Sequence, residues 1–161
     1  MIKVIKSVAE LNLQEHFNAI ESKIQWSNFG LANRQAGLQY LDGEDPWASA
    51  VGKSQGKDLE YTNLNPIFKN TIFETLINDY NLTRTRFMWV GPNTCYSMHR
   101  DITPRIHIPI ITNDQCFFVF KRGLVQNLHQ NFVCWVDTRQ THTFINCSAE
   151  SRLHLVGVVR E

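Results

Sequence analysis

The second half of the chain is a series of short apolar segments rich in β-branched and aromatic residues, the composition that favours strands. Turn residues such as Gly91-Pro92-Asn93 and Lys121-Arg122-Gly123 separate these segments. The predicted strands cover residues 85–90, 105–111, 116–120, 133–137, 142–145 and 152–159. This run of strands predicts a β-sandwich or a small barrel.

The first half has a different periodicity. Ser7 is a candidate N-cap with Glu10 as its capping-box partner, and a helical apolar stripe follows to about Lys23. A second helix is expected from Asn65-Pro66 to about Tyr80. Glycines and an acidic turn make residues 26–64 look irregular. We therefore expect one α+β domain over residues 1–161, in which helical and loop residues 1–82 support a strand-rich core over residues 83–161.

Alternate residues of a strand face the same way, so the strands can be divided into faces. Arg105 shares a face with His107, and Arg152 shares a face with His154, while isoleucines and leucines occupy the opposite faces. Two placements fit: the polar faces point to solvent, or they converge inside a barrel. Solvent-facing positions elsewhere in the sequence use Lys, Glu, Gln and Asn, so we favour convergence at a functional site.

Composition narrows the classes of function. Hydrophobic residues make up 43% and charged residues 19%, and the net charge is +1. This balance argues against a nucleic-acid or anionic-membrane partner. The apolar runs are too short to span a bilayer, and the N-terminus lacks the features of a secretory signal. We therefore expect a cytoplasmic protein.

Three residues could bind a metal. His99 and Asp101 are two positions apart in an extended segment, and His142 could supply a third ligand. Two neutral imidazoles and one carboxylate suit Fe(II) and leave coordination positions open. The His-x-Asp tripeptide alone is more often a surface turn in which the aspartate caps a backbone amide. The later His142, followed by Arg152 as a guanidinium able to pair with a carboxylate, favours the metal site.

Five ordered motifs resemble the aspartyl/asparaginyl β-hydroxylase family of 2-oxoglutarate oxygenases over residues 83–159: His99-x-Asp101, Arg105-Ile-His107, Trp135-x-Asp137, His142-x3-Asn146 and Arg152-x-His154-Leu-Val. The resemblance implies a double-stranded β-helix, the cupin-like jelly roll, with Fe(II) at its open end.

Carried over by position, the resemblance makes His99, Asp101 and His142 the iron ligands. It assigns Arg152 to the distal carboxylate of 2-oxoglutarate, and Arg105 and His107 to the end next to the metal. His154 is either a neighbour of the metal site or an interior histidine.

The expected function is hydroxylation of an amino acid, free or within a peptide or protein, with Fe(II), 2-oxoglutarate and O2. Alternatives are a cupin-like metalloenzyme that does not use 2-oxoglutarate, and a non-catalytic barrel that binds a small molecule. The irregular segment from residue 28 to residue 63 is a candidate substrate lid, with Arg34, Gln35 and Gln39 as its polar groups. The alternative is that this segment only wraps the outside of the sheet.

Overall fold

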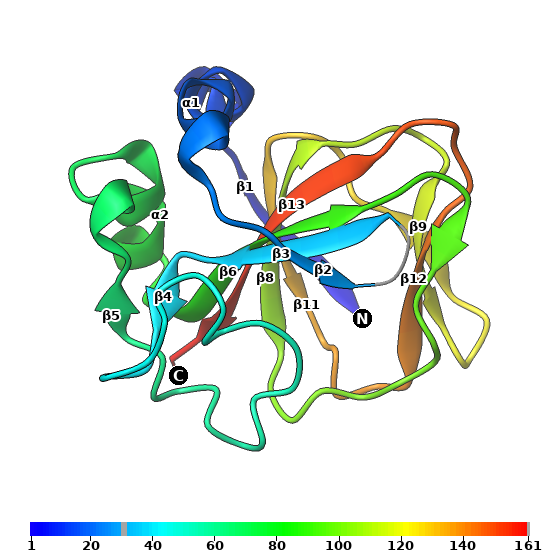
Figure 1. The fold of residues 1–161 in the computed structure, drawn as a ribbon. Helices are drawn as coiled ribbons and strands as arrows, with labels where there is room; N and C mark the ends of the chain where they lie inside the picture. Colours follow the sequence, from blue (N-terminus) through cyan, green and yellow to red (C-terminus); the bar gives the residue numbers. More distant parts are fainter. Residues whose placement is uncertain (30–31, 161) are drawn as a thin grey trace.

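The computed structural model describes residues 1–29 and 32–160, and it consists mainly of two facing β-sheets (Figure 1). Gly30, one of the glycines that suggested an irregular segment, lies outside these residues. The larger sheet has the order β1 (Ile2–Ser7), β11 (Phe132–Val136), β8 (Arg105–Ile111), β13 (Arg152–Val159), β6 (Leu82–Val90), β3 (Asn33–Gly37) and β2 (Ser27–Phe29). The smaller sheet has the order β10 (Val125–Asn127), β9 (Cys116–Phe120), β12 (His142–Asn146) and β7 (Thr94–Cys95). A short ladder joins β4 (Gln39–Tyr40) to β5 (Asn63–Leu64).

The pairings between these strands are antiparallel, as a jelly roll requires. All six predicted strands are present, as β6, β8, β9, β11, β12 and β13. The expected jelly-roll fold is confirmed. The helices α1 (Leu13–Ile20) and α2 (Ile72–Asp79) pack on one side of the larger sheet, as Figure 1 shows. Single 3-10 turns η1 (Ala9–Leu11), η2 (Glu21–Lys23) and η3 (Pro66–Phe68) flank them.

The first half of the chain differs from the prediction. Ser7 ends β1 instead of capping a helix, and α1 begins only at Leu13. Strand β1 is an edge strand held to β11 by its backbone, and five of its six residues are exposed, so no alternating pattern revealed it. Strands β2 and β3 also join the larger sheet, so residues 1–82 do not form a purely helical and loop support.

The second predicted helix is interrupted. Asn65 does cap a turn, since its side chain accepts a hydrogen bond from the backbone nitrogen of Ile67, but only the 3-10 turn η3 follows. Lys69 is then extended and Asn70 adopts a left-handed conformation with φ 59°, so helical geometry is interrupted before α2 begins at Ile72. Within the described residues, no helix has the length and apolarity needed to cross a membrane.

The alternation along the strands divides the interior into two regions. Isoleucines and leucines of β8 and β13 point to the outer side of the larger sheet, which the helices cover. There Phe17 of α1 and Phe73 of α2 both pack edge-on against Phe87, with ring centroids 5.2 and 5.0 Å from that of Phe87. The opposite face of the sheet carries the polar residues, and it is also buried. The histidines and arginines therefore converge between the two sheets, which confirms the second of the two placements.

Candidate active site

His99, Asp101 and His142 meet at one end of the space between the sheets. His99 and His142 form an antiparallel bridge with two backbone hydrogen bonds of 2.9 Å, and the Asp101 nitrogen donates to the Thr138 carbonyl, also at 2.9 Å. One ligand atom from each of the three side chains lies within 4.8 Å of the others. The His-x-Asp tripeptide is thus fixed against the start of β12, and its two side chains face the third ligand.

Backbone carbonyls fix the orientation of both imidazoles. The Nδ1 atom of His99 lies 2.7 Å from the Ser97 carbonyl, and that of His142 lies 2.9 Å from the Gln140 carbonyl. A carbonyl can only accept, so each Nδ1 carries the proton and each Nε2 keeps its lone pair for a metal. Burial lowers the pKa of His142, and the His99 ring also lowers it, so the neutral ligand form is favoured.

Arg152 is a buried cation that has no acidic partner among the described residues. Only 1% of it is exposed, and its Nε and Nη1 atoms have no hydrogen-bond partner there. Its guanidinium lies 3.3 Å from the ring centroid of Phe144, and burial lowers its pKa to about 9. The buried Tyr96 hydroxyl, which borders the same cavity, also lacks a partner. Buried polar groups are normally paired, so the two side chains have hydrogen-bonding capacity left for a ligand in this cavity.

Arg105 connects the metal end to a buried ion-pair network. Its Nη2 atom lies 3.4 Å from an Asp101 oxygen, and its Nη1 atom lies 3.1 Å from Asp58. Asp58 also pairs with Arg84 at 2.8 Å and accepts a hydrogen bond from Thr103. Burial raises the pKa of Asp58, but Arg105, hydrogen bonds and Arg84 together lower it to about 2. Asp58 therefore stays ionised and holds Arg105 in place.

His107 and His154 lie deeper on the same face of the larger sheet. Their Nδ1 atoms are 3.5 Å apart, and burial lowers the pKa of both rings well below 6.5. His107 borders the cavity described below. His154 does not border this cavity, and its ring packs between those of His107 and Phe144. The structure therefore favours the interior placement of His154.

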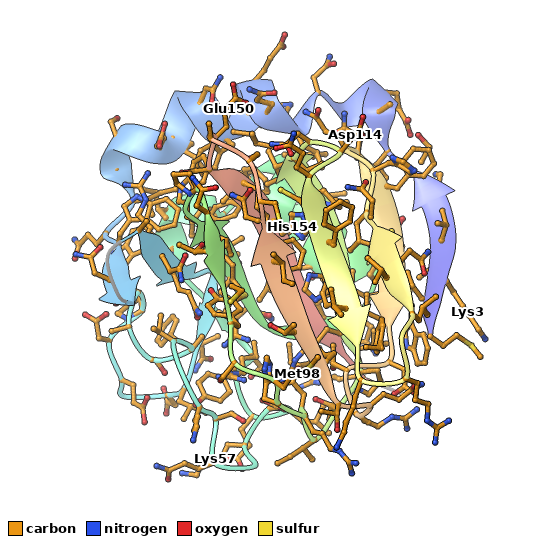
Figure 2. All side chains as sticks on the ribbon, turned by 90° about the vertical axis from the view of Figure 1, so that its right-hand side faces the viewer. Lys3, Lys57, Met98, Asp114, Glu150 and His154 are labelled. Carbon is orange, nitrogen blue, oxygen red and sulfur yellow. The ribbon has the colours of Figure 1, made fainter. Side chains whose placement is uncertain are left out.

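These residues surround one cavity of about 70 Å³ between the sheets. Its lining includes the three candidate ligands, Arg86, Arg105 and Arg152. Figure 2 shows Met98, which precedes His99, at the lower end of the molecule near the loop that carries Lys57. Glu150 and Asp114 lie at the opposite, upper end, and His154 lies near the centre, between the two ends. The metal ligands thus lie toward the same end of the jelly roll as the loop that carries Lys57, and Asp58 of that loop contacts Thr103 and Arg105.

The structure does not bring the predicted substrate residues to this cavity. Arg34 lies on the helix side of the larger sheet, where its guanidinium stacks 4.8 Å from the Trp26 ring and 5.3 Å from the Trp89 ring. Gln39 is buried and holds two backbone groups, the Leu82 carbonyl and the Thr85 nitrogen. Gln35 faces inward next to Met88, but it does not border the cavity. The lid prediction is therefore corrected for Arg34 and Gln39, because strand pairing and backbone hydrogen bonds fix both residues elsewhere.

Several cavity residues were missed in the sequence. Arg86 and Met88 have the strand parity of the inward face, so the alternation rule applied to the other strands would have found them. Tyr96 lies three residues before His99, and no motif in the sequence distinguishes it. Asp58 belongs to the glycine-rich segment and reaches Arg105 only through the fold, so the sequence held no signal for it.

A jelly roll with a His-x-Asp…His cluster at its open end and an unpaired arginine beside it defines the class of Fe(II)/2-oxoglutarate oxygenases. The family model described as "Aspartyl/Asparaginyl beta-hydroxylase" matches residues 3–160. The chain belongs to this family and is a 2-oxoglutarate-dependent hydroxylase.

Two solved structures share the fold at low sequence identity. One is an oxidoreductase of the 2OG-Fe(II) oxygenase family from Burkholderia pseudomallei, with 13% identity, a TM-score of 0.56, and coverage of 90% of this chain and 76% of that chain. The other is the viral collagen prolyl hydroxylase vCPH from Paramecium Bursaria Chlorella virus-1, solved as its 2OG complex, with 13% identity, a TM-score of 0.51, and coverage of 99% and 96%. The comparison with curated proteins gave no match.

Proposed function

We propose that His99, Asp101 and His142 bind Fe(II), and that Arg152 binds the distal carboxylate of 2-oxoglutarate in the adjoining cavity. The observation that carries this assignment is the buried, unpaired guanidinium of Arg152 in the same cavity as the three ligands. A buried charge without a partner is costly, and a dicarboxylate co-substrate would supply the partner. Arg105 and His107 line the same cavity and would hold the carboxylate end nearer the metal.

The residues present fit both groups. His99 and His142 would offer two Nε2 lone pairs and Asp101 one carboxylate, which would leave positions on a bound Fe(II) for ligands from solution. Bound iron would supply the oxidative chemistry, in which O2 and 2-oxoglutarate yield succinate, carbon dioxide and a hydroxylated substrate. The protein supplies orientation, charge and exclusion of water. Asp101 favours hydroxylation, because it occupies a position that a halogenase needs for halide.

The charges around the cavity favour an acidic or amide-bearing substrate. Four arginines are buried in this region, Arg84, Arg86, Arg105 and Arg152. Of these four, only Arg84 and Arg105 pair with a carboxylate within the described part of the chain, that of Asp58 or Asp101. Among the described residues, Arg86 donates to the carbonyls of the loop but has no carboxylate partner. We infer that the substrate is an aspartyl or asparaginyl residue of a peptide or protein, with Arg86 as a candidate contact for its side chain.

The test is turnover of 2-oxoglutarate by the purified chain with Fe(II) and O2. Succinate should form, and a panel of peptides with a central Asp or Asn should contain members that gain the mass of one oxygen atom. His142→Ala should abolish both products, whereas Arg34→Ala should retain them. Substrate oxidation that needs the metal but not 2-oxoglutarate would instead support the alternative cupin-like enzyme.

A further inference from the structure

A second hollow, of about 410 Å³, opens beside the metal ligands at the end of the smaller sheet where β9 ends and β12 begins. We call it the basic hollow, and its lining is Arg100, Phe120, Lys121, Arg122, Arg139, Gln140 and Thr141. Four of these seven residues are cationic, although the whole chain has 16 Lys and Arg residues against 15 Asp and Glu. Such a local excess of one charge on a nearly neutral protein indicates an anionic partner.

Most of this positive charge is not neutralised within the protein. Arg139 pairs with Asp137 at 2.7 Å, and Arg100 donates to the Thr141 hydroxyl at 2.8 Å. In the part of the chain that the structure describes, no carboxylate lies within ion-pair distance of Arg100, Lys121 or Arg122. Lys121 and Arg122 are exposed in the turn after β9, so their charges are available to a ligand.

The basic hollow is physically joined to the metal site. Arg100 is the residue between the ligands His99 and Asp101, and Gln140 supplies the carbonyl that orients the His142 ring. Phe120 pairs with His142 across β9 and β12, and the two ring centroids lie 6.1 Å apart. A ligand in the basic hollow would therefore lie next to a group positioned at the metal.

We propose that the basic hollow binds acidic side chains that flank the hydroxylated residue of a peptide or protein substrate. This inference rests on the proposed function and names the sequence context of its substrate. An extended peptide advances about 3.3 Å per residue, so residues one to three positions from the target lie about 3–10 Å from it, and the hollow adjoins the metal ligands through Arg100. The acidic side chains pair with Lys121 and Arg122 and increase the affinity for the correct peptide.

The hollow fits a peptide better than a nucleic acid. Single-stranded nucleic acids are bound by a basic groove together with exposed aromatic rings on which the bases stack. The only ring of the hollow, Phe120, is 2% exposed and cannot serve as such a platform.

The experiment measures binding separately from turnover. A fluorescein-labelled peptide with a central Asn and three Glu residues on each side is titrated with the protein loaded with Mn(II) and 2-oxoglutarate, and fluorescence anisotropy is recorded. A second peptide carries Gln in place of Glu. The Glu peptide should bind at least tenfold more tightly at low salt, and the difference should shrink at 0.5 M salt because exposed charges are screened, with a Debye length of about 3–10 Å above 0.1 M.

Charge-matched variants locate the binding surface. Lys121→Gln/Arg122→Gln should weaken binding of the Glu peptide about fivefold, because two exposed ion pairs are lost. The affinity for the Gln peptide should not change. Lys23→Gln/Lys69→Gln removes two exposed charges from the helix side of the molecule and should change neither affinity. Equal binding of both peptides, or an equal loss in both variants, overturns the proposal. So does oligothymidine binding that is as tight as the Glu peptide and depends on Lys121 and Arg122.

Turnover then separates the two proposals. If the Glu peptide binds as expected but the Fe(II) enzyme hydroxylates neither peptide and forms no succinate, the proposed function fails while the basic hollow stands. If both peptides are hydroxylated and bound equally well, the function stands and the role of the hollow is refuted.

Discussion

Replacing Arg152 by methionine should leave the metal-free protein as stable as before, or more stable, while removing its response to 2-oxoglutarate. The guanidinium is 1% exposed and has no acidic partner among the described residues. Lowering its pKa from 12.5 to about 9 corresponds to about 5 kcal/mol, since one pKa unit equals 1.36 kcal/mol. That free energy opposes folding with an empty pocket. Methionine has a similar length and carries no charge, so it removes the cost without opening a large cavity.

Binding of 2-oxoglutarate should respond in the opposite direction. Without Arg152 the distal carboxylate is buried without a partner, which costs about 3–5 kcal/mol, or a hundredfold or more in Kd. The assay is thermal unfolding with Mn(II), with and without 2-oxoglutarate. Wild-type Tm should rise with 2-oxoglutarate, and the Arg152→Met Tm should not.

The apoprotein Tm of Arg152→Met should equal or exceed the wild-type value. Each kcal/mol gained in the free energy of unfolding should raise the Tm by about 2–4 °C. Arg34→Met is the matched control, because it removes an arginine from the opposite face of the same sheet and should keep the full response to 2-oxoglutarate. A large loss of apoprotein stability in Arg152→Met, together with an intact ligand response, would refute the reasoning.

Three further outcomes are expected. Asp58→Asn should lose about 2 kcal/mol of stability at neutral pH, because the folded-state pKa of about 2 lies below the ordinary 3.8. Its stabilisation is complete above about pH 4 and is lost as the pH falls towards 2, so urea unfolding of wild type and variant should converge there. Arg34→Ala should leave turnover unchanged and cost about 1 kcal/mol of stability through its lost stacking; a fall in kcat would revive the lid role. Asp101→Asn should weaken metal binding at least tenfold in calorimetry, and unchanged affinity would remove Asp101 from the ligand set.

The strand-rich half was predictable because its information is local. Alternation alone placed Arg105 and His107 on one face and the isoleucines of β8 on the other, and both assignments hold. The His-x-Asp tripeptide also met His142 as expected, since β12 and the segment before Asp101 pair directly through their backbones. Such contacts follow once the order of strands in a jelly roll is assumed.

The rest depended on contacts between distant parts of the chain. Strand β1 is nearly all exposed and is defined only by its pairing with β11, so its own sequence gave a misleading helical cap at Ser7. Asp58 is buried only because Arg84 and Arg105 come to it from two separate strands. The position expected for Arg34 near the substrate was wrong, because the face on which Arg34 lies could not be assigned before the pairing of β3 with β6 was known.

The central claim is that one site binds iron through His99, Asp101 and His142 and 2-oxoglutarate beside it. Anaerobic absorption spectroscopy tests it most directly, because Fe(II) chelated by a 2-oxo acid gives a visible charge-transfer band that neither component gives alone. The band should appear when 2-oxoglutarate is added to the Fe(II)-loaded wild-type protein, and it should be absent from His142→Ala. In Arg152→Met the band should appear only at a 2-oxoglutarate concentration a hundredfold or more higher. This corresponds to a loss of about 3 kcal/mol in binding free energy. A wild-type protein without the band at saturating Fe(II) and 2-oxoglutarate would contradict the account.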